Sequence, residues 1–202
     1  MTLPALSFEF FPPKTEDGRH KLRSTWQQLA RFEPDFFSVT FGAGGSSRDN
    51  TIDTVIAIQA EGHVAAPHLS CIASSEAQIR ALLRKYQLHG IQRLVVLRGD
   101  MPSGEVGMGV FHHASDLVSF IRAETGTQFH LEVAAYPEFH PEASTPQDDI
   151  QHLKRKLAVG ANGAITQYFY NVEAYFRLVE ALEREGVTAV ITPGIMPIYN
   201  IT

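Results

Sequence analysis

The sequence predicts an α/β fold, a parallel (β/α)8 TIM barrel that is truncated after its seventh strand. Short apolar runs rich in Val, Ile and Phe alternate with longer segments that carry helix periodicity. Polar residues close six of these runs at intervals of 28 to 38 residues, typical of βα units: Glu9, Thr40, His68, Arg98, Tyr136 and Gln167. A closed barrel typically needs about 250 residues. This chain has 202, so its length also leaves an open doubly wound sheet as an alternative.

Seven strands are expected, and Gly, Pro or polar residues bound each of them: residues 6–11, 36–41, 65–71, 91–97, 130–136, 164–168 and 188–192. Helices fit between these runs, and several helix starts carry capping signals. Ser75 with Gln78 predicts a capping box. Thr145 precedes a proline that suits the first helical position, and Asn171 is suited to cap the next helix.

The chain is expected to form one barrel domain over residues 1–202. After the seventh strand it reads PGIMP at residues 193–197 and stops at Thr202, where a further helix and strand are expected. We therefore expect the C-terminal helix and strand unit to be missing. The longest predicted loop covers residues 99–113, and its four glycines and one proline would allow it to move over a ligand.

Charge and cysteine content exclude several classes of partner. The chain has 17 Lys and Arg against 22 Asp and Glu, so it lacks the basic field that nucleic acid or an anionic membrane requires. The single cysteine, Cys71, cannot form an intrachain disulfide, and without a nearby base it is expected to be a buried, inert thiol. The sequence shows neither a signal peptide nor a membrane-spanning run. We expect a cytoplasmic protein.

The carboxyl ends of parallel strands lie on one side of a sheet, so the six strand-ending polar residues should form one site. Glu9 is surrounded by aromatic residues in the segment SFEFFPP, and these surroundings should raise its pKa and suit it to act as a general acid. The alternative is an acidic side chain on an edge strand that points into water.

Three further segments offer groups for a planar, charged ligand. Arg98, Gly99 and Asp100 place a cation, a flexible backbone and an anion at one strand end, although a surface ion pair is the simpler interpretation. Tyr136 can stack on a planar cofactor and His140 lies close to it. Two glutamates flank His140, but the prolines of this segment disfavour a metal site, and we expect no bound metal.

Phosphate contacts are expected from one helix and one glycine-rich turn. Asp149, His152 and Lys156 recur on one face of a predicted helix that begins beside Tyr136 and His140. This face could contact a diphosphate, and the alternative is that it is simply solvated. The segment GAGGSS at residues 42–47 can present backbone N–H groups at a helix start. Its glycine spacing and its place after the second strand differ from the dinucleotide fingerprint, which disfavours a Rossmann dehydrogenase.

Seven of these segments together resemble the bacterial type of the FAD-dependent methylenetetrahydrofolate reductase family. They are SFEFFPP (7–13), SVTFG (38–42), PHLSC (67–71), LRGD (97–100), AYPEFHPE (135–142), LKRK (153–156) and ITQ (165–167). Their order and spacing also agree, and the resemblance runs from about residue 7 to the end of the chain. It implies a single flavin-binding (β/α)8 barrel with FAD at the carboxyl ends of its strands.

The resemblance also assigns roles to individual residues. Glu9 would protonate the bridging folate and open its five-membered ring to an iminium, and Asp100 would lie between flavin and pterin. Gln167 would contact folate or nicotinamide, while Thr40 is expected to contact substrate as well as cofactor. FAD would be bound by Thr40, Phe41, Ala43, His68, Arg98, Gly99, Asp100, Ala114, Tyr136, His140, Ala143, Asp149, His152, Arg155 and Lys156.

The implied activity is the reduction of 5,10-methylenetetrahydrofolate to 5-methyltetrahydrofolate by a ping-pong mechanism, with NADH or NADPH as reductant. Phe41 stands where a tyrosine is common in the family, and His152 where an asparagine is familiar. Two alternatives stay open: a non-catalytic flavin- or folate-binding module left by truncation, and a corrinoid-linked folate methyltransferase barrel that needs no FAD. The expected partners are small molecules, and a homo-oligomer is left open.

Overall fold

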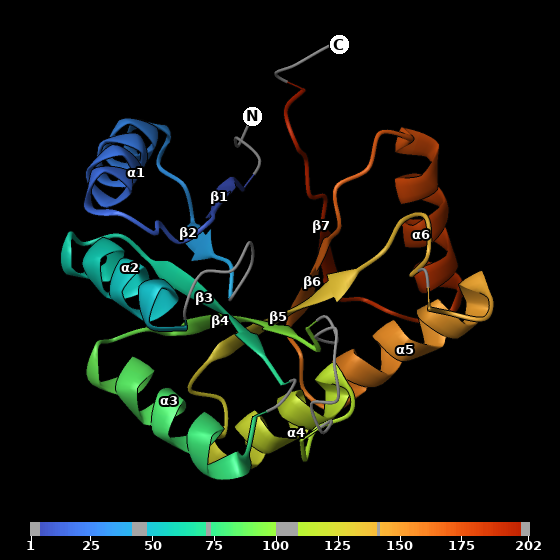
Figure 1. Ribbon diagram of the computed structural model, residues 1–202. Helices are drawn as coiled ribbons and strands as arrows, with labels where there is room; N and C mark the ends of the chain where they lie inside the picture. Colours follow the sequence, from blue (N-terminus) through green and yellow to red (C-terminus); the bar gives the residue numbers. More distant parts are fainter. Residues whose placement is uncertain (1–4, 42–47, 72–73, 100–108, 141, 199–202) are drawn as a thin grey trace.

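A computed structural model describes residues 5–41, 48–71, 74–99, 109–140 and 142–198 of the chain. Within these ranges strands and helices alternate along the whole sequence (Figure 1). The elements are β1 (Ser7–Phe10), α1 (Glu16–Leu29), η1 (Ala30–Phe32), β2 (Phe36–Val39), α2 (Arg48–Ala60), β3 (Ala65–Ser70), α3 (Glu76–Leu88), β4 (Arg93–Leu97), α4 (Ala114–Thr125), β5 (His130–Ala135), α5 (Pro146–Ala158), β6 (Gly163–Thr166), α6 (Val172–Arg184) and β7 (Val190–Thr192).

The strands form one parallel sheet in the order β1-β2-β3-β4-β5-β6-β7, so each strand pairs with its neighbours in sequence. The sheet curls, and α1 to α6 follow one another around its outer side (Figure 1). The ring is open on one side, where α1 and β1 face α6 and β7 across a gap (Figure 1). The arrangement is that of a (β/α)8 barrel up to its seventh strand, which confirms the predicted fold class.

The predicted strands all occur, with ends that differ by one or two residues. The run at 65–71, for example, is a strand from Ala65 to Ser70. The three capping predictions are also confirmed. Ser75 and Gln78 form a capping box, Thr145 caps α5 with Pro146 in its first turn, and the Asn171 side chain accepts from Glu173 N at the start of α6.

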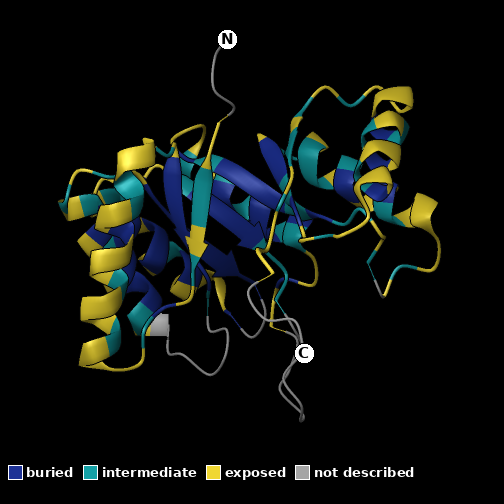
Figure 2. Ribbon diagram, turned by 90° about the horizontal axis from the view of Figure 1, so that it is seen from above, coloured by how far each residue is buried: buried dark blue, intermediate teal, exposed yellow. Residues whose placement is uncertain are grey.

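The two faces of the sheet are packed differently. The face toward the helices contains most of the buried apolar side chains, among them Val39, Leu69 and Val133. A smaller apolar cluster of Phe36, Ala66 and Val95 lies on the opposite, inner face. Figure 2 shows the buried strands between helices whose outer faces are exposed. The alternation of side chains along each strand therefore separates a helix-facing core from a barrel interior.

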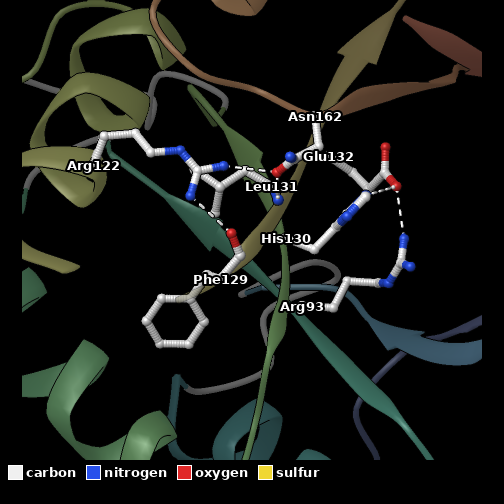
Figure 3. Close-up of polar contacts among 7 residues, drawn as sticks. All are labelled: Arg93, Arg122, Phe129, His130, Leu131, Glu132 and Asn162. Atoms are coloured by element: carbon white, nitrogen blue, oxygen red, sulfur yellow. Dashed lines mark hydrogen bonds and ion pairs between the residues drawn. The ribbon is translucent and has the colours of Figure 1, made fainter. Parts of the chain in front are cut away.

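Charged residues fill the interior at the amino ends of the central strands. Glu132 Oε1 lies 2.7 Å from Arg93 Nη1 and 2.9 Å from His130 Nε2 (Figure 3). The Arg93 guanidinium also stacks 4.6 Å from the centre of the Phe36 ring. A Cβ atom on Gly163 would lie 2.7 Å from Glu132 Oε2, so glycine at this position makes room for the carboxylate.

A second arginine ties the same end of the barrel together on the helix side. The Arg122 guanidinium donates to the carbonyl oxygens of Gly126, Phe129 and Gly160, and to the side-chain oxygen of Asn162 at 2.6 Å (Figure 3). Asn162 Oδ1 also accepts from Leu131 N. These bonds join the end of α4 to the turns that enter β5 and β6, and they satisfy carbonyl groups that helix ends leave unpaired.

The open side between β1 and β7 exposes apolar side chains. Phe11 is 67% exposed and Val190 73% exposed, and Ile195 and Ile198 after β7 are exposed as well. The best-formed hollows of the described surface lie next to β7, where Tyr175 and Ile191 line one and Leu157 and Ala189 line the other. None of the described helices has the length and apolar character needed to cross a membrane.

Candidate functional site at the carboxyl ends of the strands

The predicted residues that close the strands lie at or near the carboxyl ends of these strands, where backbone hydrogen bonds continue just past the regular ladder. Thr40 N donates to Phe10 O, and Gln167 N donates to Ala135 O. Because all seven strands are parallel, these ends lie on one side of the sheet. Asp100 and Ala43 lie outside the described residues, as do the turn at 42–47 and most of the predicted loop at 99–113.

Glu9 on β1 faces His68 on β3 across β2. Glu9 Oε2 lies 3.2 Å from His68 Nε2, a distance that suits an ion pair. The Glu9 side chain is 52% exposed, whereas that of His68 is 8% exposed. Ser38 stands opposite Glu9 in the register of β1 and β2. The carboxylate therefore has water on one side and two polar neighbours on the other.

The direction of the Glu9 pKa differs from the prediction. Partial burial is the largest influence and raises the pKa, as the aromatic surroundings suggested. The His68 imidazole and the Ser38 hydroxyl together outweigh it, so the pKa of Glu9 is lowered below its ordinary value. The prediction of a raised pKa was wrong because neighbours in sequence revealed the burial but not these partners from β2 and β3. Ser38 was not among the predicted site residues.

Two buried polar atoms beside Glu9 make no hydrogen bond within the described part of the chain. They are Thr40 Oγ1 and His68 Nε2, on side chains that are 7% and 6% exposed as residues. The approach of His68 Nε2 to Glu9 has the length of an ion pair without the alignment of a hydrogen bond. Because a buried polar atom without a partner is costly, the Thr40 hydroxyl suits a ligand with a polar edge.

Arg98, at the end of β4, pairs with Glu142 from the loop between β5 and α5. The two side chains form a two-pronged contact, with N···O distances of 2.6 and 2.8 Å. Hydrogen bonding to Glu142 raises the pKa of Arg98 and lowers that of Glu142. The sequence had suggested a surface ion pair as the simpler role of Arg98, and the structure identifies a partner 44 residues away. This contact joins two of the predicted ligand-binding segments.

Tyr136 and His140 form the aromatic part of the site. Their rings meet edge to face with centroids 4.6 Å apart. His140 N donates to Asp149 Oδ2, and His140 Nδ1 accepts from Glu142 N, so this loop is fastened to α5. Phe139, which precedes His140 in the sequence, has a φ of +52°, in the left-handed region. The strained turn sets the direction of His140. No group of three or more metal-ligating side chains occurs among the residues described.

Lys156 on α5 points toward β5, whereas the two other polar residues predicted nearby, His152 and Arg155, are exposed. Its ammonium donates to Ala134 O of β5 at 2.5 Å. Burial lowers the pKa of Lys156 to about 8, and the Asp149 carboxylate partly opposes this. Asp149 is partly buried, while His152 and Arg155 are exposed. The predicted face of Asp149, His152 and Lys156 is therefore not uniformly solvated.

The remaining predicted contacts lie in several places, and the structure does not bring all of them together. Phe41 packs against the helix-facing core, and Gly99 has a φ of +88° that favours glycine. Ala114 begins α4, and Ala143 N donates to His140 O. Gln167 is exposed, and its side chain accepts from Tyr168 N. Cys71 is buried next to Arg98 O, and burial raises the pKa of its thiol to about 11, in line with the expected inert thiol.

Comparisons with known proteins give one consistent family. The family model described as methylenetetrahydrofolate reductase matches residues 2–202. The 5,10-methylenetetrahydrofolate reductase of Pectobacterium carotovorum is 44% identical over 198 residues, which are 96% of this chain and 64% of the relative. The enzyme of the same name from Escherichia coli is 42% identical, with 96% and 65% covered. The chain thus spans about two-thirds of the length of these bacterial relatives.

A plant relative and two solved structures extend the comparison. Methylenetetrahydrofolate reductase (NADH) 1 of Arabidopsis thaliana is 39% identical over 97% of this chain and 36% of its own length. A Clostridium thermocellum protein that binds two copies of 5-methyl-5,6,7,8-tetrahydrofolic acid has a TM-score of 0.66 at 16% identity, over 94% of this chain and 65% of that one. Phosphonopyruvate hydrolase also reaches 0.66, at 9% identity over 93% and 65%. These structures share the fold, and the sequence matches show that the chain belongs to the methylenetetrahydrofolate reductase family.

Proposed function

We propose that this chain carries the flavin and folate sites of a reductase that converts 5,10-methylenetetrahydrofolate to 5-methyltetrahydrofolate with NADH or NADPH. The observation that carries the proposal is the carboxyl group of Glu9, which is held by His68 at the strand ends where the buried Thr40 hydroxyl makes no hydrogen bond within the described residues. An acid beside an unsatisfied polar surface at the carboxyl ends of barrel strands is the arrangement that such a reaction requires. Membership of the family supports the same reaction.

The described residues fit FAD in their chemistry. Thr40 and His68 would give hydrogen bonds to the polar edge of the ring system, and Tyr136 with His140 would offer it an aromatic wall. Bound FAD would supply the hydride chemistry, accepting hydride from the nicotinamide and passing it to the folate. Lys156, Arg155 and His152 would face the diphosphate, and Lys156 would have to exchange its bond with Ala134 for a phosphate oxygen.

Three residues would act on the folate. Glu9 would donate a proton to a nitrogen of the one-carbon bridge, which opens the five-membered ring and leaves an iminium carbon to accept hydride. Asp100 would hydrogen-bond the pterin, and Gln167, exposed at the end of β6, would contact the folate or the nicotinamide. In the proposed ping-pong order, the nicotinamide would leave before the folate binds.

A spectroscopic experiment separates the two half-reactions. The purified chain is mixed with FAD, reduced anaerobically with NADH, and then given methylenetetrahydrofolate while the flavin bands are followed. We expect bleaching followed by folate-dependent recovery of the bands. In Glu9→Gln the recovery should slow by about 100-fold or more, because the general acid is lost, and the bleaching should change much less.

The other outcomes decide against parts of the proposal. Retention of flavin with bleaching but no folate step would identify a binding module without turnover. Binding of the folate without any retained flavin would favour a corrinoid-linked methyltransferase. Failure to retain flavin in both this chain and a longer form that spans the full length of the relatives would refute the assignment of the cofactor.

A further inference from the structure

The pair formed by Glu9 and His68 raises a question that the proposed function leaves open. A general acid must hold a proton at the pH at which it works. The pKa of Glu9 is lowered, so at neutral pH this carboxyl group is largely ionised, and its protonated fraction falls tenfold with each further pH unit. Without a partner, Glu9 would therefore rarely carry the proton that it is proposed to donate.

His68 is placed to hold that proton. Its Nε2 atom lies 3.2 Å from Glu9 Oε2, and the ring is buried, so Glu9 is the acidic group within its reach in the described residues. On the strands beside β3, β2 carries no charged side chain, and the one charged side chain of β4, Arg93, pairs with Glu132. Ser38 on β2 contributes a hydroxyl group, and β4 places the apolar Val95 opposite His68. Histidine is the side chain that gains and loses its proton near neutral pH.

We infer that Glu9 and His68 share one proton, and that His68 passes this proton to Glu9, which gives it to the substrate. This rests on the proposed function and makes His68 a positioning and proton-holding residue in addition to a contact for the cofactor. The imperfect alignment of the two groups fits a site whose hydrogen bonds tighten when a ligand fills it.

The proton balance of the step is simple. The His68 Nε2–H bond of the imidazolium breaks as an O–H bond forms on Glu9, which leaves a neutral imidazole. The Glu9 O–H bond then breaks as an N–H bond forms on the one-carbon bridge of the folate, which leaves Glu9 as a carboxylate. Solvent water restores the proton to His68. Two coupled groups of this kind titrate in two steps that belong to the pair.

The first test needs neither flavin nor turnover. The side-chain carboxyl carbons of glutamate are labelled with 13C, the Glu9 signal is assigned with Glu9→Gln, and its shift is followed against pH. We expect two steps in the wild-type chain. His68→Gln keeps a neutral donor near the Nε2 position. In this variant we expect a single step, with a Glu9 pKa above that of the first wild-type step. The reason is that burial still raises the pKa of Glu9 while the lowering effect of the His68 charge is lost.

A matched control is His130 on β5, four strands from β1 in the order of the sheet. His130 also pairs with a glutamate, Glu132, at 2.9 Å inside the barrel (Figure 3). His130→Gln should leave the Glu9 titration unchanged. If the Glu9 curves of wild type and His68→Gln coincide, the inference is wrong. His68→Asn provides a second non-titrating side chain should the glutamine variant fold poorly, as judged by circular dichroism.

The second test uses the folate-dependent recovery of the flavin bands. In His68→Gln the rate at pH 7.5 should be at least about tenfold below wild type, and the difference from wild type should shrink as the pH is lowered, because the protonated fraction of Glu9 then rises. A loss by the same factor at every pH would mean that His68 only contacts the cofactor, and would overturn the inference. Absence of the folate step in the wild type would instead reject the proposed function, and the titration would still decide whether the proton is shared.

Discussion

Single side chains in this protein are tuned by what surrounds them in space. Lys156 illustrates this, since its ammonium is taken from water into the gap between α5 and β5 and receives one carbonyl bond in return. Burial lowers its pKa to about 8 from an ordinary 10.5. The folded protein therefore holds this proton less tightly than the unfolded chain. The cost to stability is present in full below pH 8 and disappears as the pH rises toward 10.5.

Replacing this lysine should reveal that cost. Lys156→Met should increase the free energy of unfolding at pH 7 by about 1 to 2 kcal/mol, and the gain should shrink as the pH rises toward 10.5. Urea denaturation at several pH values measures this. Lys154→Met is the control, because the Lys154 ammonium pairs with Glu185 at the helix surface. A gain that is independent of pH would show that the charge of Lys156 is not the cause.

Helix α5 carries much of the candidate site, so the way it begins matters for function. Thr145 Oγ1 accepts from Asp148 N at 3.1 Å and donates to Asp148 Oδ2 at 2.8 Å. The capped turn is followed directly by Asp149, whose carboxylate accepts a hydrogen bond from the backbone N–H of His140. The start of the helix thus fixes the loop that carries the aromatic wall of the site.

Removing the cap should loosen this region. We expect Thr145→Ala to lower the free energy of unfolding by about 1 kcal/mol and Thr145→Ser to lower it much less, since serine keeps the oxygen. Thermal unfolding followed by circular dichroism is the measurement. Thr125→Ala, which removes a hydroxyl bonded to Ile121 O within α4, serves as a comparison that involves no cap. Equal losses in Thr145→Ala and Thr145→Ser would contradict a capping role.

Elements were predictable where their signals are local. The Ser75 capping box and the strand at 65–71 depend on neighbours in sequence, and both occur with small changes at the strand end. Contacts between elements were not predictable, because side chains from distant parts of the chain meet only after folding. Arg98 and Glu142 are 44 residues apart, and Lys156 reaches a carbonyl 22 residues away. The same limitation explains why the partners of Glu9 and the direction of its pKa were missed.

At the scale of the whole molecule, the sheet has two edges on the open side of the ring. β1 and β7 each pair with one strand among the described residues, and apolar side chains lie exposed along both. An exposed apolar edge strand is a site for association with other chains. We therefore expect the 202-residue chain to self-associate through this side.

A charge on the edge tests this expectation. Val190→Lys, on β7, should reduce the concentration-dependent association seen by sedimentation velocity, because a lysine must be desolvated in any contact between edges. Leu88→Lys is the matched control, since Leu88 is 85% exposed at the end of α3, away from the open side. If both variants associate like the wild type, or both lose association equally, the open side is not the contact.

The sequential order of the strands has a consequence for how the chain is made. Because every strand joins the one synthesised just before it, each new βα unit can dock on the edge of the sheet that is already present as the polypeptide leaves the ribosome. No strand has to wait for a distant partner, which keeps loop-closure entropy small at each step. Growth of this kind leaves β1 as one edge and moves the other edge along the nascent chain, so a pause in translation would present a different strand to chaperones at each point of arrest.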